Sequence, residues 1–206
     1  MAEVDINPVF QGFRNKIGEL VFYQKDGETF VRRNGRHSDP NTESQQDVRN
    51  TFKELTSIWK QISGIMRKGW TELAKNRKGN GYNAFIKDNF AQRRAGVPIE
   101  LFKQIGDLAL LTFTAAPGAS GEAECAFTPA PVTDGRHLTI FAIRNIAEGQ
   151  MEVTVHPMGA DAASPITVTG LEPGAAYDLY AVLTDAEYTA ATQSSASKGA
   201  AVTAGS

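Results

Sequence analysis

Histidine, cysteine and serine side chains and paired carboxylates could carry out chemistry in this chain, but their spacing assembles no known type of site. The three histidines are His37, His137 and His156, and none has another histidine three or four residues away, as many zinc sites on helices require. His137 and His156 could meet across strands, although a packing or solvated role is the stronger interpretation. Cys125 is the only cysteine, which excludes an intrachain disulfide and a cysteine-based metal site and favours a small buried residue.

Other catalytic patterns are missing as well. Ser194, Ser195 and Ser197 lack the Gly-x-Ser-x-Gly pattern of a nucleophile elbow. Glu122 and Glu124 share one face of a predicted strand, but two carboxylates need a cleft before they can act as an acid–base pair. The glycine patterns of phosphate-binding and dinucleotide-binding loops do not occur. The sequence therefore predicts a protein that is not an enzyme, with no catalytic residues, no metal ligands and no cofactor.

The charged residues are unevenly distributed, although the net charge is only −2. Residues 1–100 hold 17 Lys and Arg against 12 Asp and Glu, whereas residues 101–206 hold 4 against 11. This asymmetry favours two domains and would let basic and acidic halves of neighbouring copies attract one another. It also leaves nucleic-acid binding open as an alternative, because Arg32, Arg33 and Arg36 form a basic tip. A solvated helical face, or a basic patch that contacts an acidic neighbour, is the stronger interpretation.

The first element that could position these residues is a β-hairpin over residues 17–33, in which Asp26-Gly27 is a strong turn signal. Three short helices follow, because apolar residues recur at helical spacing from Val48 to Ile62, from Met66 to Leu73 and from Tyr82 to Phe90. Their aromatic residues, which include Trp59 and Trp70, are predicted to be structural core residues.

After a junction over residues 97–106, the chain becomes rich in Ala, Thr, Val and Gly and poor in Lys. About seven short strands in roughly 100 residues, separated by turn residues, suit an antiparallel sandwich. The expected strands are Leu108 to Ala115, Gly121 to Thr128, His137 to Arg144, Met151 to His156, Ile166 to Thr169, Tyr177 to Thr184 and Gly199 to Thr203. The fold class is therefore α+β, with a hairpin and helical domain over residues 1–98 and an all-β sandwich over residues 99–206.

One turn of the second half has a specific pattern. Leu171 is followed by Pro173 and Gly174, and Tyr177 then opens a strand of alternating side chains. In a sandwich of two sheets, such a tyrosine places its ring in the core while its hydroxyl bonds to the backbone of the preceding turn. We therefore expect these four residues to have structural roles.

The second half resembles a fibronectin type III-like domain over residues 105–206. The resemblance is carried by the Leu-x-Pro-Gly-x-x-Tyr element, by Tyr180 and Val182 after it, and by Ser195-Ala196-Ser197 before the last strand. The chain departs from that family in having no tryptophan in the second strand. The resemblance implies an immunoglobulin-like β-sandwich.

The first half resembles a family of uncharacterised proteins of Bacteroidetes and related bacterial or phage genomes, defined as a domain of unknown function. The residues that carry this resemblance are Gly12-Phe13, 18–23, Gly27, 30–32, 39–42, Arg49, Phe52, Trp59 and 81–85. The resemblance implies no activity and no catalytic residue. Members of the family often join this segment to a sandwich-like tail.

These observations together predict a non-catalytic structural or interaction protein, self-assembling as a component of a phage particle or surface assembly. Homo-oligomers or other structural proteins of an assembly are the expected partners, and the best-placed contact residues are Phe22, Tyr23, Phe30 and Val31 of the hairpin. Nucleic-acid binding through the basic first half and adhesion through the sandwich loops are the alternatives.

The sequence also bears on location. No apolar run approaches the roughly 18 residues that cross a membrane. The first residues are acidic and lack the basic and apolar parts of a secretory signal. We therefore expect a virion or cytoplasmic protein without membrane contact.

Overall fold

The chain divides into two compact units, Met1–Thr42 and Glu43–Ser206, in the computed structural model. The structure describes residues 2–3, 15–35, 40–62, 64–77, 79–110, 112–128, 135–187 and 192–206. Within this part of the chain, no helix is both long and apolar enough to cross a membrane.

The first unit contains a small antiparallel sheet in the strand order β1-β4-β3-β2. Its strands are β1 (Ala2–Glu3), β2 (Asn15–Ile17), β3 (Leu20–Lys25) and β4 (Glu28–Arg33). Asp26 and Gly27 join β3 to β4 with φ angles of 54° and 89°. These positive angles match the right-handed twist of the paired strands and explain why Asp-Gly closes this turn. The predicted hairpin is confirmed.

The second unit begins with the three predicted helices, α1 (Glu43–Gln61), α2 (Gly64–Lys75) and α3 (Gly81–Arg94). Asn80 caps α3, because its side chain accepts a hydrogen bond from the N–H of Asn83 at 2.8 Å. The predicted apolar faces form the core between the helices, where Leu55, Trp70 and Phe85 are fully buried.

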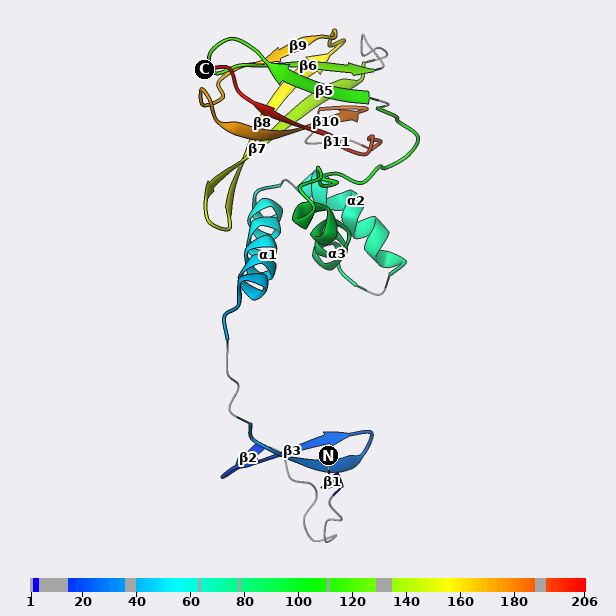
Figure 1. Cartoon of the computed structure of the whole chain (residues 1–206). Coiled ribbons are helices and arrows are strands. Elements are labelled where there is room, and N and C mark those ends of the chain that lie inside the picture. Colours follow the sequence, from blue (N-terminus) through cyan, green and yellow to red (C-terminus); the bar gives the residue numbers. More distant parts are fainter. Residues whose placement is uncertain are drawn as a thin grey trace. The chain divides into compact units, whose positions relative to one another are not determined.

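Two antiparallel sheets follow and pack face to face (Figure 1). One sheet has the order β5-β6-β9, and the other has the order β11-β10-β7-β8. The strands are β5 (Thr112–Pro117), β6 (Ala123–Thr128), β7 (His137–Ala147), β8 (Gln150–Ala160), β9 (Ile166–Val168), β10 (Ala176–Thr184) and β11 (Lys198–Thr203). Seven strands split three and four between two sheets form a sandwich of the immunoglobulin and fibronectin type III kind. The α+β fold class is confirmed.

The helices and the sandwich share one of the two hydrophobic cores of the described residues. The first core lies between the sheets and contains Cys125, Leu179 and Leu183. The second lies on the other face of the four-stranded sheet, where Phe141 and Tyr180 join the apolar faces of the helices. Figure 1 shows the helices against this sheet, on the far side from β5, β6 and β9.

The domain boundary that the sequence places at residue 98 stays a prediction. The compact units of the structure divide after Thr42, so the helices and the sandwich lie in the same unit. The physical reason is burial, because the helices cover apolar side chains that the four-stranded sheet would otherwise expose to water. The basic helices and the acidic sandwich therefore already lie together within a single unit. Residues 1–42 hold six Lys and Arg against six Asp and Glu, so the first unit has no net charge. The charge asymmetry consequently lends less support to head-to-tail contact between copies than the sequence alone indicates.

Candidate interaction surfaces

The turn before β10 has the geometry that its sequence predicts. The Tyr177 hydroxyl accepts a hydrogen bond from the N–H of Glu172 at 2.9 Å, while the Tyr177 side chain is buried between the sheets. Leu171 is also buried in this core, and Gly174 has a φ of 71°, which favours glycine. Pro173 lies in the same turn, near Gly121. Tyr177 thus joins this turn to the core between the sheets, and a structural role for all four residues stays a prediction.

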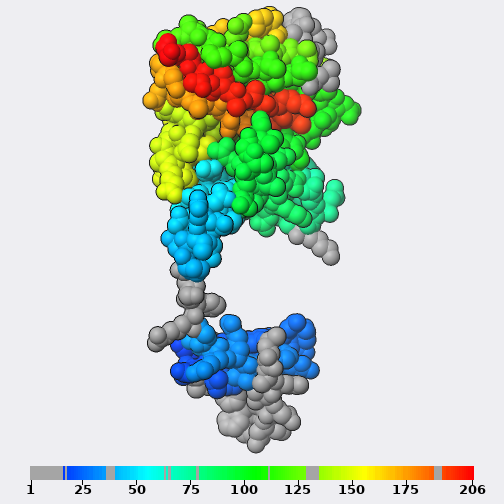
Figure 2. Space-filling view, viewed as in Figure 1, coloured from blue at the N-terminus to red at the C-terminus, as the bar shows by residue number. Residues whose placement is uncertain are grey.

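Residues 97–106, which we call the strap, run between the helices and the sandwich. Ser197 holds the strap from the sandwich side, because its hydroxyl accepts hydrogen bonds from the N–H groups of Leu101 and Phe102 at 2.7 and 3.0 Å. The hydroxyl of Tyr180 similarly accepts from the N–H of Ile99 at 3.1 Å. Figure 2 shows this part of the chain, coloured green, filling the space between the helices and the strands. The strap therefore has no freedom to act as a flexible linker.

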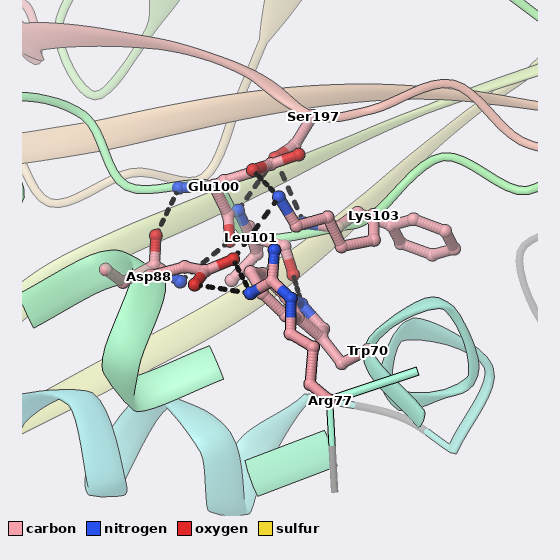
Figure 3. Close-up of polar contacts among 9 residues, drawn as sticks. Trp70, Arg77, Asp88, Glu100, Leu101, Lys103 and Ser197 are labelled. Atoms are coloured by element: carbon pink, nitrogen blue, oxygen red, sulfur yellow. Dashed lines mark hydrogen bonds and ion pairs between the residues drawn. The ribbon is translucent and has the colours of Figure 1, made fainter. Parts of the chain in front are cut away.

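The helices hold the other side of the strap. The Trp70 indole N–H donates to the carbonyl oxygen of Leu101 at 3.1 Å, and the ammonium of Lys103 lies 4.9 Å from the centre of the Trp70 ring. Lys103 also forms ion pairs with Glu100 and Asp88, and Figure 3 shows these three side chains together with Trp70. Trp70 is thus a core residue that also fixes the junction.

Trp59 is partly buried and has a comparable structural setting. Its ring lies 5.3 Å from that of Phe85 and 5.9 Å from that of Tyr82. The guanidinium of Arg67 lies 5.3 Å from the ring and donates to the carbonyl oxygens of Trp59 and Lys60 at the end of α1. Arg67 therefore satisfies carbonyl groups at the C-terminus of a helix, where a positive charge is favourable.

A largely buried ion-pair cluster joins the helices to the sandwich. The Arg93 guanidinium on α3 bonds to Glu54 of α1 at 2.8 Å and to Asp178 of β10 at 3.0 Å. Burial alone would lower the pKa of Arg93, but the hydrogen bond and charge of Glu54, together with Asp178, raise it above its usual value. The Arg93 guanidinium therefore contacts one carboxylate of the helices and one of the sandwich.

The proposed contact residues of the hairpin lie on both faces of the first sheet. Phe22 is opposite Val31 on one face, and Tyr23 is opposite Phe30 on the other. The rings of Tyr23 and Phe30 stack with their centres 5.6 Å apart. All four side chains are half-buried, and Thr29 is the only buried side chain between residues 20 and 33. Contact through these side chains remains a prediction.

Part of the basic tip of the hairpin is already paired with an acidic side chain of the same sheet region. Arg33 is exposed and forms an ion pair with Glu19 at 2.9 Å, whereas Arg32 is simply exposed. Arg36 lies outside the described residues, and so does His37.

Several basic side chains on or next to the helices are paired with acidic side chains. Lys75 bonds to Glu72, Arg77 to Asp88, and Arg94 to Asp47, each at 2.7–2.8 Å. With Arg93 and Arg67 also engaged, the charge left for an external anion is smaller than the sequence indicates.

The side chains considered for chemistry do not converge. His156 is opposite Ile140 while His137 is opposite Ala160, so the two histidines do not meet across the strands. Cys125 is fully buried, as expected, and burial followed by the charge of Glu124 raises its pKa to about 11. In the part of the chain that the structure describes, no group of three or more His, Cys, Asp or Glu side chains could hold a metal ion.

One feature that the sequence analysis missed is a groove of about 820 Å³ between α1 and the β7–β8 hairpin. Figure 2 shows the tip of this hairpin, coloured yellow-green, against α1, coloured cyan. The Ser57 hydroxyl accepts from the N–H of Met151 at 3.1 Å, and the Gln61 side chain accepts from Val153 at 3.0 Å and donates to the Met151 carbonyl oxygen. Two polar side chains thus pair with the free edge of β8, as a further strand would. The sequence signal for this contact was the spacing of four residues between Ser57 and Gln61, which places both polar side chains on one face of α1.

Among the comparisons with known proteins, only the one with solved structures found similar chains. No protein-family model and no curated protein sequence matches the chain. The FN5 domain of Drosophila Lar is 16% identical, with a TM-score of 0.35, and the match covers 48% of this chain and 96% of that domain. The fn3 domain of human collagen alpha-1(XX) is 18% identical, with a TM-score of 0.36, and the match covers 49% of this chain and 89% of that domain. The fold assignment given above therefore depends on the strand order and on the Tyr177 corner.

Proposed function

We propose that this chain is a non-catalytic structural or interaction protein that assembles with copies of itself, as a component of a phage particle or surface assembly. The observation that carries the proposal is the contrast in burial between the two units. Both described cores lie in the second unit, whereas the sheet of the first unit has half-buried aromatic residues on both faces. A small sheet gains stability when its apolar faces are covered, and contact with a neighbouring copy would cover them.

The non-catalytic part of the proposal is supported by the burial of three of the four faces of the sandwich sheets. The inner faces are filled by the core that contains Phe127 and Leu138, and the outer face of the four-stranded sheet is covered by the helices. The second unit would then act as a rigid spacer or displayed module.

Light scattering on the full chain and on residues 43–206 tests the assembly. Because both cores lie in the shorter chain, it should fold and unfold cooperatively by itself. We expect oligomers from the full chain and monomers from the shorter one. A full chain that stays monomeric at high concentration, or a shorter chain that assembles equally well, would contradict the proposal.

Point variants then locate the contact. Replacing Tyr23 and Phe30 by serine removes the apolar pair from one face of the sheet, and replacing Phe22 and Val31 removes it from the other. Loss of assembly in one variant and not the other would identify the contacting face. The exposed Lys25→Ser variant is the control and should assemble as the original chain does.

Nucleic-acid binding is the alternative with less support, because most of the arginines on the helices are already paired. It predicts a mobility shift with DNA or RNA that weakens steeply with added salt. Adhesion through the sandwich loops predicts capture of a carbohydrate or a surface ligand by residues 43–206 alone.

A further inference from the structure

Two Asn-Gly pairs occur in this chain, and they lie in contrasting surroundings. Asn34-Gly35 follows directly after β4 in the first unit, and Asn80-Gly81 begins α3 in the second. Such a pair can react with itself, because the backbone nitrogen of the glycine can attack the side-chain carbonyl carbon of the asparagine. Glycine permits this attack most readily, since it has no Cβ to hinder the approach and few restrictions on its backbone angles. The surroundings of each pair therefore decide whether it reacts.

Both residues of the first pair are open to solvent. Asn34 and Gly35 are exposed, and a Cβ added at Gly35 would have no described neighbour within 4 Å. The N–H of Asn34 donates to the carbonyl oxygen of Glu19 at 2.6 Å, and the N–H of Gly35 donates to that of Arg33 at 3.0 Å. Within the described residues, the side-chain amide of Asn34 has no hydrogen bond that must break. This side chain can therefore turn toward the nitrogen of Gly35 at little cost.

The second pair is held in place by the start of α3. The side chain of Asn80 accepts a hydrogen bond from the N–H of Asn83 at 2.8 Å, and its backbone carbonyl oxygen accepts from Ala84 at 3.1 Å. Gly81 is buried, and a Cβ added there would lie 2.9 Å from the hydroxyl oxygen of Thr71 on α2. Reaction at Asn80 would therefore break the cap of α3 and move its first turn against α2, which the fold opposes.

From this contrast we infer that Asn34 is a site of spontaneous deamidation, whereas the fold protects Asn80. The backbone nitrogen of Gly35 loses its proton and bonds to Cγ of Asn34, and the side-chain nitrogen takes up a proton and leaves as ammonia. Water then opens the resulting succinimide ring. Its attack on Cγ breaks the bond from Cγ to the Gly35 nitrogen and gives aspartate, whereas its attack on the backbone carbonyl carbon of residue 34 breaks the original peptide bond and gives isoaspartate.

The product differs from the original chain in charge and in the length of its main chain. A carboxylate replaces a neutral amide next to Arg33, so the net charge of the basic tip of the hairpin becomes less positive. The isoaspartate form also routes the main chain through the side chain, which adds one carbon atom to the connection between β4 and α1. This modification does not depend on the proposed assembly.

Mass spectrometry of the full chain after incubation in mildly alkaline buffer tests the inference. Cleavage after lysine places the two pairs in separate peptides, residues 26–53 and 79–87. We expect the first peptide to gain the mass that accompanies replacement of an NH2 group by OH at Asn34, and we expect Asn80 to stay unchanged. The reaction at Asn34 should become faster with rising pH, because the Gly35 nitrogen must lose its proton. An unmodified Asn34, or equal modification of Asn34 and Asn80, would overturn the inference.

Gly35→Ala is a matched variant that leaves the asparagine in place. The backbone at Gly35 does not require glycine, since its φ is not positive and a Cβ there would have no described neighbour within 4 Å. The variant should slow the modification of Asn34 by about tenfold or more, because the Cβ hinders the approach of the nitrogen. An unchanged rate would contradict ring closure through Gly35.

Incubation in urea separates the effect of the fold from that of local sequence. Unfolding removes the cap of α3 and should raise the rate at Asn80 to that at Asn34, while the rate at Asn34 stays nearly the same. If Asn80 remained unmodified in the unfolded chain, the fold would not be what protects it, and the inference would be wrong.

Discussion

The outer faces of the two sheets of the sandwich differ in burial: the helices cover one, and the other is open to solvent. In β6, Ala123, Cys125 and Phe127 are buried, while the residues between them are exposed. In β10, burial is continuous from Leu179 to Thr184, because alternate side chains enter the core between the sheets and the core beneath the helices. Strands covered on one face show alternating burial, whereas strands covered on both faces are apolar nearly throughout.

This difference arises from the helices, which lie in the same compact unit as the sandwich and cover one of its sheets. Without them, the outer face of the four-stranded sheet would expose Phe141, Tyr180 and Val182. The three-stranded sheet presents Thr112, Thr114 and other small or polar residues instead and needs no cover. A set of variants can test how far this contrast extends.

The largest effect is expected at Tyr180, on the covered face. Tyr180→Ala removes a buried ring and leaves the N–H of Ile99 without its acceptor. It should lower the free energy of unfolding by about 4 kcal/mol in urea denaturation. Thr114→Ala on the open face should change it by less than about 0.5 kcal/mol. Similar values for the two variants would refute the contrast between the faces.

Arg93 should come next, because it joins α3 to β10. Arg93→Met leaves Glu54 and Asp178 largely buried without their cation and should cost about 3 kcal/mol. Arg94→Met breaks the exposed pair with Asp47 and should cost less than about 1 kcal/mol. Denaturation curves of the two variants measure the difference, and a loss at Arg94 as large as that at Arg93 would count against a buried junction.

The contact between α2 and the strap can be tested with two glycines. A Cβ added at Gly69 would lie 2.4 Å from the carbonyl oxygen of Lys103, so Gly69→Ala must displace the strap and should cost about 2 kcal/mol. Gly64→Ala, where an added Cβ would have no described neighbour within 4 Å, should be neutral or slightly stabilising. If Gly69→Ala were equally harmless in thermal unfolding, the close packing of the strap would be wrong.

The corner at Tyr177 should contribute less, since one hydrogen bond is involved. Tyr177→Phe keeps the ring in the core but leaves the Glu172 N–H without its acceptor, at a cost of about 1 kcal/mol. Chemical denaturation at several temperatures would measure this loss. An unchanged free energy of unfolding would mean that the hydroxyl does not hold the corner.

The smallest effect concerns pH. Burial lowers the pKa of His156 on β8, so the unfolded chain binds the proton more readily than the folded chain. The free energy of unfolding should therefore fall as the pH decreases below the ordinary histidine value of about 6.5. His156→Gln should flatten this part of the pH profile, and an identical profile in the variant would contradict the assignment.

Much of the fold follows from local sequence. Asp26-Gly27 predicts the hairpin turn, helical spacing predicts the three helices, and the Pro-Gly turn before Tyr177 predicts both the sandwich and its hydroxyl contact. The division into compact units after Thr42 and the groove could not be derived in the same way. Both depend on which residues far apart in the sequence meet, as Gln61 meets Val153 on the edge of β8.

A signal for the shared core was present nonetheless. The runs from Leu138 to Ile143 and from Leu179 to Leu183 are nearly continuous in apolar residues, and this pattern indicates a sheet covered on both faces. It does not indicate what covers the outer face. A second layer of strands, a partner or the preceding helices would satisfy the same pattern.

The sequence by itself determined the elements of this protein, because turn chemistry and the periodicity of apolar residues act over a few residues. It also determined that Cys125 and the inner face of β6 are buried, since alternation within one strand is sufficient for that. Tertiary structure alone decided that the helices complete the sandwich, that most of the arginines on the helices are used internally, and that a groove opens between α1 and the β7–β8 hairpin. Those outcomes depend on apolar burial and charge pairing between distant segments, which local patterns do not specify.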